Sequence, residues 1–314
     1  MDRKIRVSNY SDSLFDESSS NTSWYKVFNL IGPGSRVLDV GCSSGNFGKE
    51  LISRKRCTVD GIEIDEGDAK IASTVLNRVW RLDIETADLS DLPTGAYDIV
   101  YFGDVIEHLV NPVATLRRIK RLLSTKGRVI FSIPNMGHVS VRLALLAGRF
   151  EYTETGLLDK THLHFYTQDE VDRIFEEAGY RIKTLDFVRK DYPRSLLEKE
   201  LAKYGLKANN NFYKKMASTQ ASAFQFVGSA KPGAQKNRKL KQFGPIDMFE
   251  TYYNDTKNGY ESKIAELQSV IASQKKQIRD LQSVIKSKGE HPYRAVGEHI
   301  KKRLMGGKSG NKSV

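Results

Sequence analysis

Cysteines and long apolar runs are scarce in this sequence. Only Cys42 and Cys57 occur among 314 residues, and their spacing matches no zinc-ligand pattern, so neither a disulfide framework nor a cysteine-ligated zinc site is expected. No apolar run approaches the roughly 18–20 residues that cross a bilayer. The N-terminal segment lacks the apolar core of a secretory signal. These absences favour a protein that works in the reduced cytoplasm.

The first 190 residues carry almost no net charge. They hold 26 Lys and Arg against 27 Asp and Glu, whereas residues 191–314 hold 24 against 11. The whole excess of +12 therefore belongs to the C-terminal part. The pattern predicts a nearly neutral domain with a basic appendage that could contact anionic lipid, nucleic acid or an acidic partner.

Apolar segments of strand length alternate with amphipathic segments of helix length. This alternation predicts βαβ units, and several strands are almost continuously apolar, as buried parallel strands are. The expected strands are residues 36–41, 58–65, 79–84, 97–104, 127–134, 180–190 and 222–231. The main expected helices are residues 46–55, 68–76, 111–123 and 168–179. The sequence therefore predicts an α/β fold with a Rossmann-like, seven-stranded, mostly parallel sheet and helices on both faces.

Changes in composition divide the chain into parts. The expected parts are a mobile serine-rich arm (1–22), a globular domain (23–231), a basic linker (232–258), a coiled coil (259–288) and a basic tail (289–314). Within the domain, residues 135–167 form an insertion after the fifth strand. Insertions of this length in a compact domain are often functional lids.

A heptad pattern runs through residues 260–285. Isoleucine recurs at one core position as Ile264, Ile271, Ile278 and Ile285. The other core position holds Tyr260, Leu267, Gln274 and Leu281. Isoleucine at one position with leucine at the other favours a parallel two-stranded coil, and a polar core residue can fix its register. A homodimer through this segment is expected; the alternative is a lone amphipathic helix that packs on the domain.

The basic tail places Val296, Ile300 and Leu304 four residues apart, beside Lys301, Lys302 and Arg303. A short helix with this face could lie on a membrane surface, which would make the protein peripheral at the inner membrane face. It could equally dock a partner protein or remain solvated.

Two glycines and two serines separate an apolar strand from a helix in VLDVGCSSGNFGKEL, Val37–Leu51. Gly41 and Gly45 have no Cβ atom, so a ligand can approach the main chain there. In open α/β sheets this turn is a place where nucleotides bind. A phosphate-binding loop is excluded because no Lys-Ser/Thr pair follows, and the G-x-G-x-x-G dinucleotide pattern fails at Ser43.

Acidic residues stand at the ends of the first four expected strands. Asp39 precedes the glycine turn, and Glu63 could accept hydrogen bonds from both hydroxyls of a ribose. Asp83 could accept a hydrogen bond from an adenine amino group, while Ile64 could cover an adenine face. Asp104 ends the fourth strand at the same edge. Taken alone, each acid could instead cap a helix or lie solvated in a loop.

As an ordered set, these segments resemble the motif series of class I S-adenosylmethionine (SAM)-dependent methyltransferases. The series reads VLDVGCSSGNFGKEL, VDGIEID, LDIE, YDIVYFGDVIEHLVNP and GRVIFSIPN, and the resemblance covers about residues 24–231. It implies SAM as the cofactor and S-adenosylhomocysteine as the product. The implied cofactor-binding residues are Asp39, Gly41, Cys42, Ser43, Gly45, Glu63, Ile64, Asp83, Ile84, Asp104 and Val105. Ser43 replaces the third glycine that is common in the family.

The segments DVIEHL and GLLDKTHLHFYTQDEVDRIFEEAGY are similar to those of small-molecule and sugar O-methyltransferases. These include enzymes of the ubiquinone pathway and of bacterial polysaccharide assembly. The resemblance implies methyl transfer to a hydroxyl of a sugar, a glycan or another small metabolite. It also suggests that the coil or the tail could join a partner in glycan assembly.

A hydroxyl acceptor must lose a proton, so a base within hydrogen-bond reach would help, and histidine has a suitable pKa. Three histidines are expected near the mouth of the site: His108 after the fourth strand, and His162 and His164 in the insertion. His162 is the first candidate. A histidine pair could also hold a metal, but no carboxylate stands at ligand spacing apart from Asp159, so no metal is expected.

Two other functions remain open. An RNA methyltransferase could use the basic C-terminal region for phosphate contacts. However, GDVIEH occupies the place where amino-directed enzymes carry an NPPY-like motif, and neither cysteine suits a nucleophile, so nucleic acid is not the expected partner. The other alternative is a cofactor-binding scaffold of a glycan-assembly complex that transfers no methyl group.

Overall fold

The computed structural model describes residues 19–233, 245–287, 297, 298, 300 and 301, and within 245–287 the side chains of 261–284 and 286. Most of the expected arm and of the basic tail therefore lies outside the described residues, as do residues 234–244 of the linker and the side chains of Tyr260 and Ile285. Residues 245–258 of the expected linker belong to a helix. The chain divides into two units near residue 240. Each unit is considered by itself.

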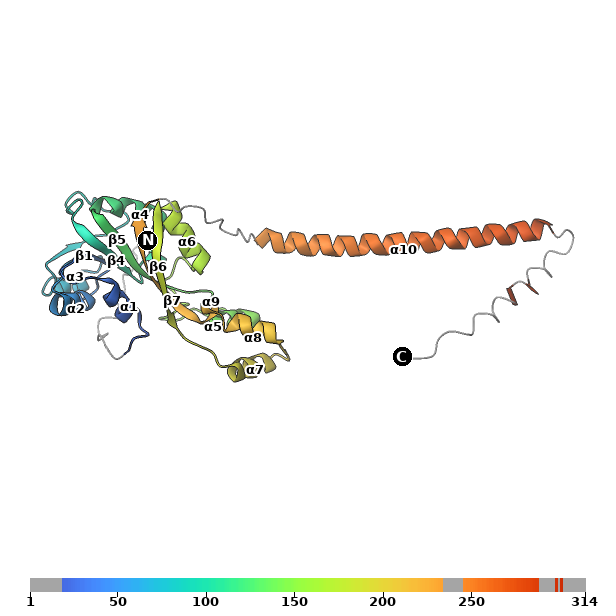
Figure 1. Ribbon diagram of the computed structural model, residues 1–314, viewed down its shortest axis with the longest axis horizontal. Helices are drawn as coiled ribbons and strands as arrows, with labels where there is room; N and C mark the ends of the chain where they lie inside the picture. The colour runs from blue at the N-terminus through green and yellow to red at the C-terminus, as the bar shows by residue number, and fades with distance from the viewer. Residues whose placement is uncertain (1–18, 234–244, 288–296, 299, 302–314) are drawn as a thin grey trace. The chain divides into compact units, whose positions relative to one another are not determined.

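The first unit is built on one seven-stranded sheet with the order β3-β2-β1-β4-β5-β7-β6 (Figure 1). The strands are β1 (Arg36–Val40), β2 (Thr58–Glu63), β3 (Arg78–Arg81), β4 (Tyr97–Gly103), β5 (Leu123–Pro134), β6 (Tyr180–Arg189) and β7 (Ala223–Pro232). The first five run parallel, whereas β7 is antiparallel to both β5 and β6. The predicted α/β fold with a mostly parallel sheet is confirmed.

Helices cover both faces of the sheet. On one face, α1 (Ser23–Leu30), α2 (Asn46–Lys55) and α3 (Glu66–Ala72) pack into a core with Val37, Val59 and Ile99. On the other face, α4 (Pro112–Ile119) and α6 (Gln168–Glu177) pack against Leu38 and Phe102. Successive strand residues thus supply opposite cores, as the period of a strand requires.

The fifth strand begins earlier than the sequence predicts. Its first residue, Leu123, pairs with Tyr97, and the register then shifts so that Arg128 pairs with Ile99. Gly127 lies inside this bulge, where a Cβ atom would come within 2.7 Å of the Tyr97 carbonyl oxygen. The glycine that reads as a strand boundary is therefore an internal position where two backbones come close.

The insertion after β5 contains α5 (Val139–Leu146) and then returns to the sheet edge. There the Met136 amide donates to the Tyr166 carbonyl oxygen at 2.8 Å. Helix α5 packs with α7 (Arg194–Ala202), α8 (Asn210–Met216) and α9 (Thr219–Ser222) around Val139, Leu197 and Ala221. Figure 1 shows these four helices gathered beyond one end of β6 and β7.

The second unit contains α10 (Pro245–Ser287), a helix of 43 residues. Among the described helices, none is both long enough and apolar enough to cross a membrane.

Candidate active site

The turn between β1 and α2 is held in a left-handed conformation that opens its main chain. Gly41 and Gly45 have φ angles of +72° and +81°, and Ser43 between them has a φ of +47°. A Cβ atom on Gly41 would lie 2.6 Å from Cγ2 of Val105. The turn therefore requires glycine for its backbone angles and for the close approach of the loop after β4.

Glu63, the last residue of β2, ties this turn to the neighbouring strand. Its Oε2 accepts a hydrogen bond from the Ser43 amide at 2.8 Å. Its Oε1 accepts from the amides of Ile64 and Asp65 at 2.8 and 2.9 Å. Burial raises the pKa of this carboxyl, and the three amides counteract that rise. The carboxylate is thus fixed at the sheet edge, as predicted, in a position to accept further hydrogen bonds.

Asp39 is buried in β1 beside Glu63. Burial, followed by the charge of Glu63, raises the pKa of Asp39 to about 7. The Cys42 side chain is buried in the core beside Gly61, where a Cβ atom would lie 2.6 Å from its Sγ. Only the main chain of Cys42 can therefore border the turn.

The three residues expected to border the adenine differ in how far their side chains are exposed. Ile64 is 41% exposed at the edge, which leaves its side chain available to a ligand. Ile84 is buried in the core, so it could contribute only main-chain atoms. Asp83 lies beyond β3 and accepts from the Glu85 amide at 2.8 Å and the Thr86 hydroxyl at 3.1 Å. It therefore also serves as a local turn cap, the alternative role left open for it.

Asp104 follows β4 with a φ of +55°, a strained angle for a residue with a side chain. Its Oδ1 accepts from the hydroxyl of Ser132 at 3.1 Å and from the side-chain amide of Gln225. Burial raises the pKa of Asp104, and these two hydrogen bonds oppose the rise. Strands β5 and β7 thus hold this carboxylate at the same sheet edge as the glycine turn.

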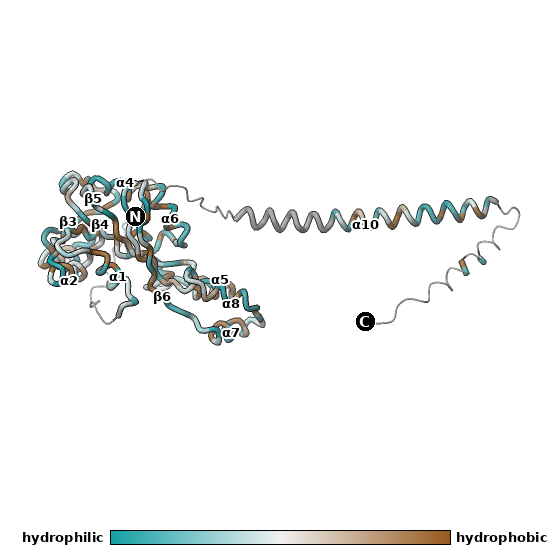
Figure 2. Tube along the Cα trace, in the orientation of Figure 1, coloured by the Kyte–Doolittle hydropathy of each residue, from teal (hydrophilic) through white to brown (hydrophobic). Residues whose placement is uncertain are grey.

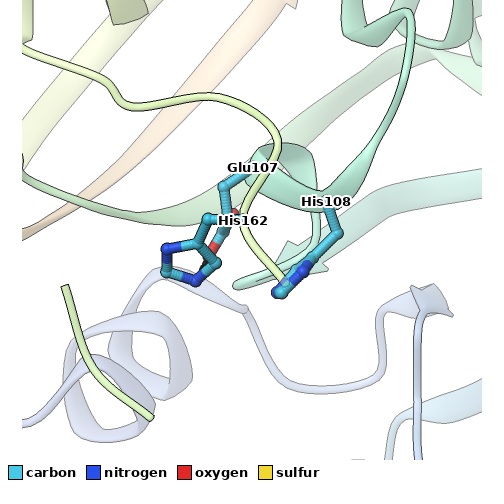
Figure 3. A group of neighbouring side chains, drawn as sticks. All are labelled: Glu107, His108 and His162. Carbon is cyan, nitrogen blue, oxygen red and sulfur yellow. Dashed lines mark ion pairs between the residues drawn. The ribbon is translucent and has the colours of Figure 1, made fainter. Parts of the chain in front are cut away.

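Glu107, His108 and His162 form a cluster that sequence reasoning identified only in part. Their candidate ligand atoms all lie within 4.8 Å of one another. The Glu107 side chain is fully buried, and neither carboxylate oxygen has a hydrogen-bond partner among the described residues. Its Oε1 lies 4.0 Å from Nε2 of His162. Figure 3 shows the Glu107 carboxylate beside the His162 ring, with His108 facing them.

The surroundings of the cluster set its electrostatics. Burial, followed by the charge of Asp104, raises the pKa of Glu107 well above its ordinary value. Burial, followed by His108, lowers the pKa of His162. Nδ1 of His108 lies 3.1 Å from the Thr161 carbonyl oxygen. In a neutral imidazole this contact places the proton on Nδ1 and the lone pair on Nε2.

The main chain of the insertion, residues 135–167, is hydrogen-bonded to the cluster. The amides of Leu163 and His164 donate to the Glu107 carbonyl oxygen at 2.9 and 3.1 Å. One oxygen of Asp159 is hydrogen-bonded within the insertion: its Oδ1 accepts from the amide and the hydroxyl of Thr161 at 2.8 and 2.7 Å. Glu107 is thus the residue whose carboxylate oxygen lies near both imidazoles, while Asp159 acts on His162 through its charge.

The structure brings His162, and not His164, into the cluster. Residues 161–165 form no strand, and Nε2 of His164 lies 3.4 Å from the Val110 carbonyl oxygen. The cluster can therefore act through two imidazoles and one carboxylate. These groups could exchange a proton with an acceptor. They could also hold a divalent cation, since imidazole nitrogens and carboxylate oxygens are zinc ligands at about 2.0–2.2 Å; the three groups would have to move closer together to bind it.

Comparisons with known proteins agree with this geometry. Residues 22–185, more than half of the chain, match the family of methyltransferase domains. A ubiquinone biosynthesis O-methyltransferase of Acinetobacter baylyi is 29% identical over 160 residues, which cover 48% of this chain and 66% of that protein. One from Dinoroseobacter shibae is 31% identical over 152 residues, which cover 46% of this chain and 60% of that protein. The chain thus spans less than two thirds of the length of these relatives.

Among solved structures, a SAM-dependent methyltransferase from Archaeoglobus fulgidus has the same fold. Its TM-score is 0.50 at 18% identity, and the match covers 69% of this chain and 94% of that chain. The residues matched by the family include the glycine turn, the acids at the sheet edge, and the Glu107 cluster. The chain therefore belongs to the methyltransferase domain family, and its fold is the class I fold that the ordered motifs predicted.

Proposed function

We propose that the protein transfers the methyl group of SAM to a hydroxyl of a small acceptor. The observation that carries this proposal is the left-handed glycine turn joined to the buried carboxylate of Glu63. The turn exposes main chain to a ligand, and the carboxylate beside it can accept hydrogen bonds from ribose hydroxyls. Methionine would lie along the turn, the ribose at Glu63, and the adenine near Ile64.

The sulfonium end would point toward Asp104 and Val105. Asp104 is held by strands β5 and β7, and Val105 contacts the position of Gly41. Because the sulfonium already activates the methyl group, the protein must mainly orient the acceptor and keep water away. The insertion, residues 135–167, would serve both tasks as a lid, since its amides at Leu163 and His164 donate to the Glu107 carbonyl oxygen.

The Glu107 cluster would activate the acceptor hydroxyl. His108 presents a lone pair on Nε2 when Nδ1 donates to the Thr161 carbonyl oxygen. Glu107, when ionised, would stabilise a positive charge on either imidazole. A divalent cation held by the three groups is the second candidate, and the unpartnered carboxylate of Glu107 favours it. A cation there would bind the hydroxyl and lower its pKa.

The acceptor class rests on the relatives and on one lid segment. The relatives named above are O-methyltransferases of ubiquinone biosynthesis. The sequence of the segment DKTHLHFYT resembles segments of methyltransferases of polysaccharide assembly. The relatives and this resemblance both support a hydroxyl on a small molecule as the acceptor. We propose a sugar or glycan hydroxyl, because a heptad-bearing extension suits an assembly of glycan enzymes.

Calorimetry with S-adenosylhomocysteine tests the cofactor site. Glu63→Gln should weaken binding by about 10- to 100-fold, the effect of losing a hydrogen bond to a charged group. Glu66→Gln is the matched control, because the Glu66 side chain is 74% exposed. Absence of binding to the unaltered protein, or equal affinities for Glu63→Gln and the unaltered protein, would overturn the assignment.

A further inference from the structure

We propose that α10 pairs with α10 of a second copy of this chain, as a parallel, in-register, two-stranded coiled coil over residues 260–285. The proposal goes beyond methyl transfer and does not depend on it. It rests on the exposed side chains of the helix, on the place of one polar residue in the pattern, and on the charges beside it.

The described part of α10 has an apolar stripe and no core of its own. Ile264, Leu267, Ile271 and Ile278 are 50–54% exposed, and none of the described side chains of 261–284 is buried. Figure 2 shows brown positions recurring between teal ones along this part of the helix. Burying a large apolar side chain contributes about 1.5–3 kcal/mol, so the stripe favours association.

The polar core residue selects the orientation. The heptad places Gln274 between Ile271 and Ile278 on the stripe. In a parallel, in-register pair, each Gln274 meets its own copy, and the two side-chain amides can exchange hydrogen bonds. In a full-overlap antiparallel pair, each amide would face Ile271 of the other copy without a partner. Because a buried amide without a partner is unfavourable, the parallel arrangement is preferred.

The residues at the heptad positions that flank the apolar stripe do not repel a second copy of the helix. In the parallel register, Lys263 faces Gln268 of the other copy, Val270 faces Lys275, and Gln277 faces Gln282. None of these three pairs combines like charges, so nothing at them opposes a second copy. Isoleucine and leucine at the two core positions favour two strands over three.

The mass of the full chain in solution tests the pairing. Light scattering or sedimentation equilibrium should give twice 35.5 kDa for the unaltered protein. Ile271→Lys combined with Ile278→Lys should give the monomer mass. The matched control is Ser269→Lys combined with Ser273→Lys, which adds the same charge at heptad positions on the outer face. This control should remain a dimer, and both variants should keep the thermal unfolding of the first unit.

Cross-linking tests the orientation. Leu267→Cys should form a covalent dimer under mild oxidation, since this residue meets its own copy in the parallel register. The two native cysteines are free and buried, so they would not interfere. Ser269→Cys, on the outer face, is the matched control and should remain uncross-linked.

A monomeric unaltered protein, or a dimer that survives the two lysines, would overturn the proposal. Cross-linking of Leu267→Cys only when Ile278→Cys is also present would show an antiparallel pair and would overturn the parallel arrangement. Neither result bears on S-adenosylhomocysteine binding, so failure here is distinguishable from failure of the proposed function.

Discussion

The Ser43 amide donates to Oε2 of Glu63 at 2.8 Å and so joins the turn after β1 to the end of β2. A single carboxylate therefore has two tasks: it holds the turn in shape and stands where a ribose could bind. This coupling means that the cofactor loop and its acidic neighbour form one unit. Changes that distort the turn should weaken cofactor binding even where they remove no ligand contact.

Gly41→Ala should distort the turn by a steric clash. The new Cβ would lie 2.6 Å from Val105 Cγ2, in addition to the cost of a φ of +72°. Gly34 provides the matched control, since its φ is +70° and nothing lies within 4 Å of its Cβ position. Gly34→Ala should lower the free energy of unfolding by about 1–2 kcal/mol. Gly41→Ala should lower the free energy of unfolding by about 1–3 kcal/mol more than Gly34→Ala does.

Urea unfolding of the two alanine variants gives the stabilities, and calorimetry gives their affinity for S-adenosylhomocysteine. Affinity should fall for Gly41→Ala and stay unchanged for Gly34→Ala. Equal losses of stability in the two variants would contradict the clash with Val105.

Asp39 should make stability depend on pH. Its pKa is raised from 3.8 to about 7, so the folded chain keeps a proton that the unfolded chain has lost in this window. Stability should therefore fall as the pH rises from about 4 to about 7, by on the order of 4 kcal/mol for this group. Asp39→Asn should gain stability relative to the unaltered protein as the pH rises.

Thermal unfolding at pH 5, 6, 7 and 8 measures this difference. The exposed Asp91, changed to asparagine, is the control and should show no such trend. If the difference between Asp39→Asn and the unaltered protein stayed constant from pH 5 to pH 8, the raised pKa would be wrong.

Glu107→Gln should reduce methyl transfer by about 100-fold or more, because it removes the carboxyl group that can bind and release a proton at the centre of the cluster and keeps the shape. S-adenosylhomocysteine affinity should change little, since no cofactor contact is assigned to this residue. Glu170→Gln on α6 is a suitable control, because the Glu170 side chain is 44% exposed. An unchanged rate for Glu107→Gln would remove the cluster from the mechanism.

Thermal shift with Zn²⁺, Mn²⁺ or Mg²⁺ distinguishes the two chemistries of the cluster. Stabilisation of the unaltered protein that Glu107→Gln lacks, together with loss of activity in EDTA, would assign a cation to the site. Activity that is insensitive to EDTA, with no such stabilisation, would assign proton transfer by the histidines.

The elements of the fold could be predicted more completely than the contacts of the site. Residues 46–55 form the expected helix, and the strand–helix alternation predicted the sheet because buried strands and amphipathic helices have distinct periods. The bulge at Gly127 was missed, since a glycine within a strand and one at its end look alike. The adjacent pairing of β7 with β5 also depends on contacts far apart in the chain.

The place of the glycine turn and of Glu63 at one edge of the sheet could be predicted because strand ends in one parallel sheet share an edge, whereas their binding of a cofactor stays a prediction. The role of Glu107 could not, because it lies next to His108 but 55 residues before His162, and only the folded lid brings them together. The sequence held one signal: Glu107 stands between the apolar residues Ile106 and Leu109. Both of these are buried in the structure. A carboxylate in such a position requires a partner or a function.

The two lid histidines should differ in importance. His162→Asn should lower kcat by about 100-fold, because it removes an imidazole whose Nε2 lies 4.0 Å from the Glu107 carboxylate. His164→Asn should lower kcat by no more than about threefold, because its Nε2 faces the Val110 carbonyl oxygen at 3.4 Å and not the cluster. Steady-state kinetics with a methyl acceptor measures both, and calorimetry should show unchanged cofactor affinity. A larger loss for His164→Asn than for His162→Asn would place the reacting hydroxyl on the Val110 side of the lid, away from Glu107.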